Sequence, residues 1–172
     1  MWGIDVHNNF LVTSSADKTL NVWTLDLAST WTWKCQLKNE DIPVRNVIIL
    51  KKEPNLALSG DLVGDLKVWN LNSGKLEFQV PDPGEQGLFR QSGSIVSLAQ
   101  NSDIIVSAFT NKTIAIFSSE FCAQKLPLLS LVSLDEHMDR HSFIRNVCIA
   151  DGEIYVCNVA GNFGLIILNI WE

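Results

Sequence analysis

An eleven-residue segment occurs four times along this chain in one register, and each copy has the pattern of a strand, a tight turn and a second strand. The copies span 13–23, 59–69, 107–117 and, more loosely, 158–168. They close on bulky apolar residues, which are Trp23, Trp69, Phe117 and Leu168. These residues recur about every 45 to 50 positions, a period typical of propeller blades and not of helical solenoids. The chain is therefore expected to be an array of small antiparallel sheets.

Alternating apolar residues and turn signals around these hairpins divide the chain into four units. The approximate units are 1–37, 42–80, 94–134 and 143–172, and the last lacks its outer strand. No segment keeps apolar residues at helical spacing over the roughly ten residues that identify a helix. The predicted fold class is all-β, with about four propeller blades of four antiparallel strands forming an incomplete propeller. The polar connections 81–93 and 135–142 are expected to be exposed loops that carry binding specificity.

The chain is expected to be intracellular, cytoplasmic or nuclear, because most of its cysteines lie in apolar contexts and no signal-peptide pattern occurs, and no cofactor-binding motif is found. The 172 residues are 47% hydrophobic and 19% charged, and the net charge is −6. No run of Lys and Arg supplies the charge density that nucleic acid or an anionic membrane requires, so neither is an expected partner. The four cysteines lie far apart, without the spacing of a zinc or redox site, at Cys35, Cys122, Cys148 and Cys157.

The first two hairpins resemble the second half of a WD40 repeat, through the segment 15–23 that ends in Trp23 and through Lys67-Val68-Trp69-Asn70. In that family a turn Asp, a Ser or Thr of the preceding strand, the closing Trp and a loop His form a buried hydrogen-bonded tetrad. The resemblance assigns three of these roles in the first unit to Asp17, to Thr13 or Ser15, and to Trp23. The structural repeat residues across all units are Asp17, Trp23, Trp69, Asn111, Phe117 and Asn162.

The later units depart from the family pattern, because Val63, Asn111 and Asn162 replace the turn Asp and no Gly-His precedes an inner strand. These units are expected to depend on apolar packing and on turn hydrogen bonds. The chain is identified as a divergent member that resembles the C-terminal half of a larger propeller. Its open ends then predict self-association.

The resemblance implies a non-catalytic scaffold or adaptor that binds a protein or peptide through its faces and loops. A narrower alternative is the substrate-recognition part of a ubiquitin ligase of the F-box type. An alternative of another class is a propeller enzyme such as a hydrolase, which would need carboxylates clustered at a central pocket. The candidate carboxylates are Asp5, Asp61, Asp65 and Asp103.

Two matched segments offer a binding site: Val44-Arg45-Asn46-Val47 and Ile144-Arg145-Asn146-Val147 begin the inner strands of units two and four. Guanidinium groups bind carboxylate and phosphate bidentately, so these Arg-Asn pairs predict recognition of an acidic or phosphorylated peptide. The alternative is that the arginines only solvate the rim or pair with Asp41 and Asp139.

Two further features favour structural interpretations. Trp31 and Trp33 alternate with polar residues, so both face one side of a strand, and packing against the adjacent unit is favoured over an exposed aromatic patch. His137 and His141 lie among carboxylates, but Arg140 between them favours a solvated loop over a metal site.

Overall fold

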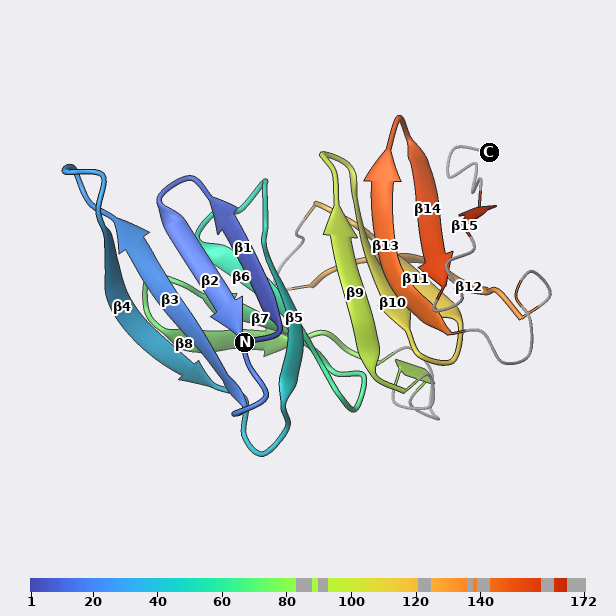
Figure 1. The fold of residues 1–172 in the computed structure, drawn as a ribbon, viewed down its shortest axis with the longest axis horizontal. Coiled ribbons are helices and arrows are strands. Elements are labelled where there is room, and N and C mark those ends of the chain that lie inside the picture. Colours follow the sequence, from blue (N-terminus) through green and yellow to red (C-terminus); the bar gives the residue numbers. More distant parts are fainter. Residues whose placement is uncertain are drawn as a thin grey trace.

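The computed structural model describes residues 1–82, 88–89, 93–120, 125–135, 138, 143–158 and 163–166. Their strands form four antiparallel sheets (Figure 1). The first sheet consists of β1 (Gly3–His7), β2 (Phe10–Ser14), β3 (Thr19–Leu25) and β4 (Trp31–Lys38). The second consists of β5 (Val44–Ile49), β6 (Leu56–Asp61), β7 (Leu66–Asn70) and β8 (Lys75–Gln79).

The third sheet consists of β9 (Ile95–Gln100), β10 (Ile104–Phe109), β11 (Thr113–Ser118) and β12 (Leu128–Ser133). The fourth consists of β13 (Ile144–Ala150), β14 (Glu153–Asn158) and β15 (Phe163–Ile166). The prediction of an all-β fold built from antiparallel strands is confirmed. Asn162, His137, His141 and most of the two predicted loops lie outside the described residues.

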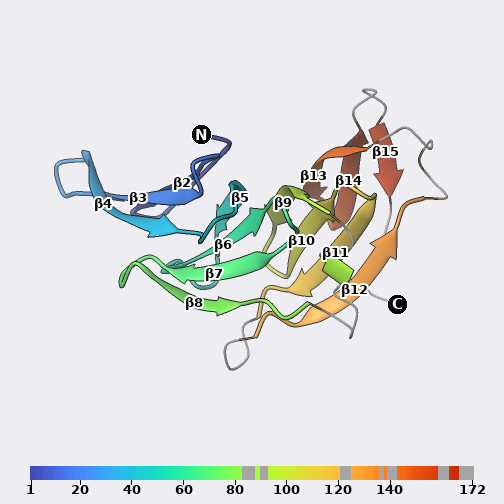
Figure 2. The ribbon, with the colours of Figure 1, turned by 90° about the horizontal axis from the view of Figure 1, so that it is seen from below.

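The sheets follow one another face to face, each pair enclosing an apolar core (Figure 2). Between the first and second sheets, the side chains of Val12, Val22, Ile49 and Trp69 belong to one buried cluster. A second cluster joins the second and third sheets, and a third joins the third and fourth. Alternate residues of each strand enter these cores because successive side chains of a strand point to opposite faces. Within the described residues, no helix has the length and apolar character to cross a membrane.

The first strands of the four sheets run beside one another, with β1 against β5, β5 against β9 and β9 against β13. β1 and β13 lie at opposite ends of this row (Figure 1). The four sheets are separate, and none curls or closes into a propeller, so the propeller prediction is not supported. The repeat specifies the hairpin inside each sheet through strand alternation and turn residues. It carries no information on the angle between sheets or on a contact between the first and the last.

The tetrad expected in the first unit does not form. Asp17 is exposed, and its Oδ1 accepts hydrogen bonds from the backbone N–H of Thr19 at 3.1 Å and from the Thr19 hydroxyl at 2.6 Å. Trp23 is only half-buried. An Asp two residues before a turn amide can accept a hydrogen bond from that amide, and Asp17 uses its carboxylate within its own turn in this way. Asn111 does the same in the third sheet, where its Oδ1 accepts from the Thr113 N–H at 3.0 Å.

The closing tryptophan of the second sheet is buried and forms a hydrogen bond to a serine of the preceding strand. Trp69 is 4% exposed, and its Nε1–H donates to the Ser59 hydroxyl at 2.8 Å. Phe117, which takes this place in the third sheet, is 1% exposed and packs edge-on against Phe89. Both tryptophans were expected to bury their rings and to donate the indole N–H to a nearby Ser, Thr or Asp, and the structure shows this for Trp69.

The prediction that Trp31 and Trp33 pack against the adjacent unit is wrong. Trp33 is 62% exposed and Trp31 is 37% exposed. A register shift between Val22 and Trp23 places Trp33 opposite Trp23, on the side of the first sheet that faces away from the core. A bulge of this kind adds one residue to a strand and redirects the side chains that follow.

Candidate functional site

Both Arg-Asn segments begin their strands with a β-bulge. The register of β5 against β6 shifts between Val44 and Asn46, and that of β13 against β14 shifts between Ile144 and Asn146. Arg45 and Arg145 are therefore the extra residues of two equivalent bulges. Bulges redirect side chains and occur often beside functional sites. The matched sequences thus correspond to a matched backbone irregularity.

Apolar neighbours anchor each bulge. Val44 and Ile144, before the arginines, are 0% and 2% exposed. Val47 and Val147, after them, are 5% and 3% exposed. Because the flanking side chains are locked in the cores between sheets, the backbone that carries each arginine is held on a rigid strand.

The two asparagines connect neighbouring sheets. The Asn46 side chain donates through Nδ2 to the Ile95 carbonyl oxygen at 3.3 Å. The Asn146 Oδ1 accepts from the Ser97 hydroxyl at 2.5 Å and from the Val147 N–H at 3.0 Å. Both therefore tie their own strand to β9. The sequence predicted that the Arg and the Asn of each pair bind the same ligand. In the structure each Asn side chain forms a hydrogen bond to β9, whereas each Arg side chain projects from its strand.

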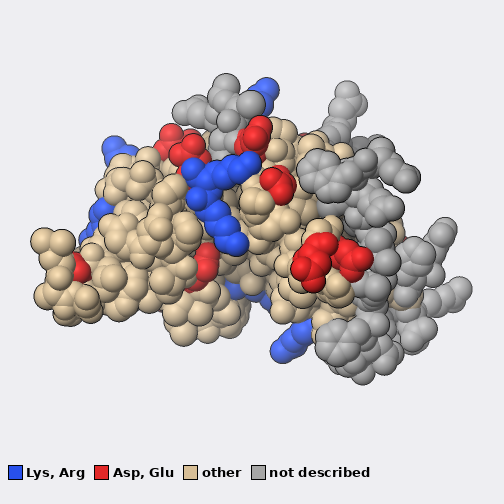
Figure 3. All heavy atoms as spheres, turned by 90° about the horizontal axis from the view of Figure 1, so that it is seen from above, with Lys and Arg blue, Asp and Glu red and all other residues tan. Residues whose placement is uncertain are grey.

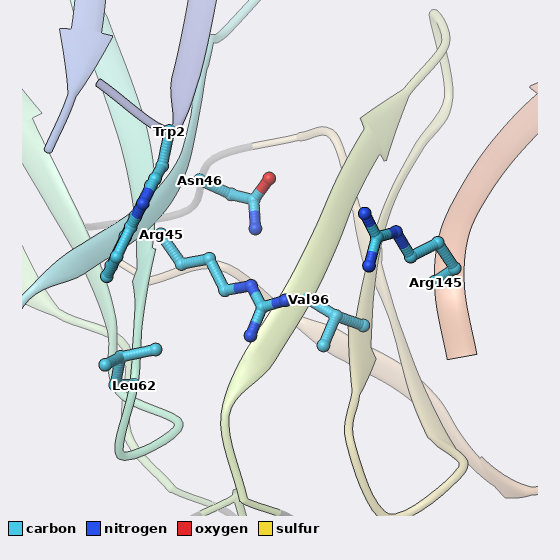
Figure 4. Close-up of a pocket in the computed structure, with 6 residues that line it drawn as sticks. All are labelled: Trp2, Arg45, Asn46, Leu62, Val96 and Arg145. Atoms are coloured by element: carbon cyan, nitrogen blue, oxygen red, sulfur yellow. The ribbon is translucent and has the colours of Figure 1, made fainter. Parts of the chain in front are cut away.

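The two arginines meet at one cavity of about 430 Å³. Figure 4 shows Arg45 coming from β5 and Arg145 from β13, on either side of the β9 strand that carries Val96. The cavity is lined by Trp2, Arg45, Asn46, Leu62, Val96 and Arg145. Its volume lies in the range of about 300 to 1,000 Å³ that is usual for ligand sites. Asn146 is not among the described lining residues, because it is turned toward Ser97.

The cavity is locally basic in an acidic protein. No carboxylate is present among its described lining residues. Asp41, which was considered as a partner for an arginine, instead pairs with the Lys18 ammonium at 3.3 Å. Neither guanidinium forms an ion pair within the described part of the chain, from which Asp139 is excluded. Two arginines that have no ion-pair partner among the described residues, both held on rigid strands, are suited to hold an anion.

Sequence reasoning missed three residues of this lining: Trp2, Leu62 and Val96. They come from the segment before β1, from the turn after β6 and from β9. Only the side-by-side placement of β1, β5, β9 and β13 brings them together, and the strand pattern of a single unit does not contain that information.

A second cavity, of about 600 Å³, lies beyond Leu62, which lines both. Its polar lining includes Lys67 and Asp65, which are 4% and 9% exposed. The Lys67 ammonium already donates to the Asn39 Oδ1 at 2.8 Å. The Lys67 ammonium in this cavity is therefore already engaged in a hydrogen bond that belongs to the fold.

The carboxylates that a propeller hydrolase would need are dispersed. Asp5 lies in β1 and accepts the Ile49 N–H at 2.7 Å, while Asp61 and Asp65 belong to the β6–β7 hairpin. Asp103 is exposed in the turn before β10. No cluster of three or more metal-binding side chains occurs within the described ranges.

Comparison with known proteins identifies the fold alone. No protein-family model matches the chain, and no curated protein matches it. Among solved structures, the computationally designed Ika4 protein is 20% identical, with a TM-score of 0.69 over 98% of this chain and 91% of that one. The computationally designed Ika8 protein is also 20% identical, with a TM-score of 0.68 over 97% of this chain and 45% of that one.

These findings correct the family assignment. The WD40 resemblance is contradicted, because the structural neighbours are designed proteins, no family model matches, and the four sheets are separate. The resemblance depended on short motifs around Trp23 and Trp69. Such motifs encode a stable hairpin, and any antiparallel sheet with the same turn can contain them. The ubiquitin-ligase alternative was drawn from that resemblance, and it stays a prediction.

Proposed function

We propose that this protein is a non-catalytic interaction protein that binds an acidic or phosphorylated segment of a partner protein in the cavity between Arg45 and Arg145. One observation carries the proposal: two equivalent bulges, in the second and fourth sheets, direct arginines into the same cavity. A planar guanidinium donates two parallel hydrogen bonds to a carboxylate or phosphate.

The cavity suits a short anionic group on a chain. Trp2 and Val96 provide apolar contact beside the two guanidiniums, and Asn46 adds an amide. A site of this kind fixes an anion by charge and the neighbouring atoms of the ligand by packing.

Charge on the rest of the surface favours a local contact over a long polyanion. Lys and Arg side chains gather near the middle of the face shown in Figure 3, and Asp and Glu side chains lie directly beside them. With a net charge of −6, the protein as a whole repels nucleic acid. The partner is therefore expected to present one anionic side chain or a few.

The test uses immobilised degenerate peptides centred on phosphoserine, on aspartate or on serine, followed by fluorescence anisotropy with the best binder. Arg45→Glu and Arg145→Glu should each weaken binding by about tenfold or more, as expected for a contact at a binding hot spot. Thermal melts should stay nearly unchanged, because Arg145 is exposed and Arg45 half-buried.

Lys75→Glu is the matched control, since Lys75 is exposed on β8 and makes the same change in net charge. Its affinity should equal that of the wild type. Equal binding of serine and phosphoserine peptides, or unaltered binding in both arginine variants, would contradict the proposal.

A further inference from the structure

The first sheet has one face that no other described sheet covers. It is formed by Ile4, Val6, Leu11, Trp23 and Trp33, which we call the free face. The register aligns Val6 with Leu11, Leu11 with Trp23 and Trp23 with Trp33, so four apolar side chains cross the sheet in one row. The opposite face supplies the core toward the second sheet.

The free face is exposed to an extent unusual for such side chains. Trp33 is 62% exposed, Ile4 56% and Val6 50%. Leu11 and Trp23 are half-buried between them. Single exposed apolar residues are common, but a contiguous apolar patch marks an interaction surface.

The apolar row itself carries no charge, and the charged residue on this side of the sheet is Lys38 at the end of β4. The other residues on this side of β2, β3 and β4 are Thr13, Thr19, Asn21, Leu25, Trp31, Gln36 and Lys38. A sheet face exposed to water normally carries polar and charged residues along the whole length of its strands, whereas the middle of this face is an unbroken apolar row. The composition here is that of a face covered by another sheet.

Every other interface in this molecule shows what covers such a face. The second sheet contacts a sheet on each side, and so does the third, through three apolar clusters. We propose that the free face is covered by the free face of a second copy of this chain, so that two first sheets pack together about a two-fold axis.

Among the described side chains, the other end of the row is less apolar than the free face. Along β13, at the other end of the row, the exposed residues include Arg145, Asn146 and Cys148, which are charged or polar. Pairing the free face with itself buries the apolar row of both copies. Two-fold interfaces, in which one patch meets its own copy, are the commonest kind.

A single four-stranded sheet offers a small interface, so the dimer should dissociate on dilution. Sedimentation velocity of the full chain from about 1 to about 300 µM covers the range in which such an interface dissociates. The weight-average mass should rise with concentration toward twice the monomer mass of 19.2 kDa. Val6→Lys and Trp33→Lys should each stay monomeric over the whole range.

Leu129→Lys is the matched control, because Leu129 is 53% exposed on β12 and far from the first sheet in sequence. It should dimerise like the wild type. Hydrogen exchange at high concentration gives a second measurement, with added protection expected in β1 and β4. Both readouts are independent of the arginine cavity, so Arg45→Glu should leave the dimer intact whether or not the peptide proposal holds.

A monomer at every concentration would overturn the proposal. So would a dimer that survives both lysine variants, since another surface would then make the contact. Loss of the dimer in Leu129→Lys as well would show that added charge alone prevents association and would equally overturn it.

Discussion

The hairpins 13–23 and 59–69 have the same pattern, but their turns are held in opposite ways. In the first, Asp17 is exposed and bonds only within the turn, to Thr19. In the second, Asp61 is 1% exposed and lies two positions earlier in the repeat, in line with Ser15. The carboxylate that organises the turn has therefore moved from the turn tip into the strand, where it is buried.

The buried carboxylate of the second hairpin is part of a network. Asp61 accepts the N–H groups of Val63 at 3.1 Å and Asp65 at 2.9 Å. Its second oxygen accepts the Asn39 amide at 3.2 Å, and the Asn39 oxygen accepts the Lys67 ammonium at 2.8 Å. The first hairpin has Asn21 in the place of Lys67, and a half-exposed pair with Gln36 at 3.4 Å replaces the network.

The comparison shows that similarity to a known motif is a poor guide to burial. Trp23 follows the more familiar turn, with Asp17, yet Trp69 is the one that is buried. The second hairpin lies between two sheets, whereas the first lies at the end of the row and, among the described strands, has one neighbouring sheet. Position in the row therefore decides burial.

The largest difference is expected for the two closing tryptophans. Trp69→Ala should lower the free energy of unfolding by about 3–5 kcal/mol, through lost burial and a cavity. Trp23→Ala should cost about 1–2 kcal/mol, because a half-exposed side chain loses less burial and leaves no closed cavity. Urea unfolding at low protein concentration, where the free face is unpaired, measures both. Equal losses would mean that Trp23 is as well packed as Trp69.

The buried network predicts the next largest effect. Asn39→Ala should destabilise by about 2–4 kcal/mol, because it leaves a buried carboxylate oxygen and the Lys67 ammonium without this partner. Asn21→Ala, at the equivalent place in the exposed pair, should change stability by no more than about 0.5 kcal/mol.

A double variant separates hydrogen bonding from packing. Asn39→Leu combined with Lys67→Met removes both members of the Asn39–Lys67 hydrogen bond. The unfolding free energy of the double variant should therefore fall by less than the sum of the losses in the two single variants. Strict additivity would indicate that Asn39 and Lys67 act independently and that the network is not a unit.

These differences mark what the sequence can predict. Alternation and turn residues predicted antiparallel strands and the closing positions Trp69 and Phe117, because those signals are local. The pairing of Arg45 with Arg145 was suggested by their matched segments, and the structure places both at one cavity. The bulges that direct them, the burial of Lys67 and the exposure of Trp33 depend on which sheet lies opposite. No single repeat encodes that contact.

The turn backbone gives a third comparison. Lys18 and Gly64 occupy the same repeat position, with φ of 72° and 92°. A Cβ on Gly64 would lie 2.5 Å from the Phe89 carbonyl oxygen and 2.7 Å from that of Gly93. Gly64→Ala should therefore destabilise by about 1–3 kcal/mol, since both the backbone conformation and the close approach oppose a side chain.

Lys18→Gly is the matched change at the first hairpin. Its effect should lie between zero and a gain of about 1 kcal/mol, because glycine relieves the left-handed backbone and the surface pair with Asp41 contributes little. Chemical unfolding of Gly64→Ala and Lys18→Gly measures both changes in the free energy of unfolding. A Gly64→Ala protein as stable as the wild type would show that the segment around Phe89 moves away from the turn.

The smallest expected effect is on pH dependence, where the two turn carboxylates should have opposite signs. The hydrogen bond from the Thr19 hydroxyl lowers the pKa of Asp17, whereas burial raises the pKa of Asp61 above its ordinary value of 3.8. A raised folded-state pKa means that the native state holds the proton more tightly than the unfolded chain. The contribution of Asp61 is therefore fully present below pH 3.8 and is lost as the pH rises through the folded-state pKa. For Asp17 the contribution is present above the ordinary value and is lost as the pH falls.

Asp61→Asn and Asp17→Asn test these signs by urea unfolding at steps from about pH 3 to about pH 7. The stability of the wild type relative to Asp61→Asn should decrease as the pH rises, while its stability relative to Asp17→Asn should increase. The test depends on how the difference in unfolding free energy changes with pH and not on its size at one pH. In Asp61→Asn the new amide nitrogen would face the Asn39 Nδ2, and this adds a pH-independent loss of stability. Slopes of the same sign for both variants would contradict the contrast between the hairpins, since they would place the two carboxylates in the same kind of environment.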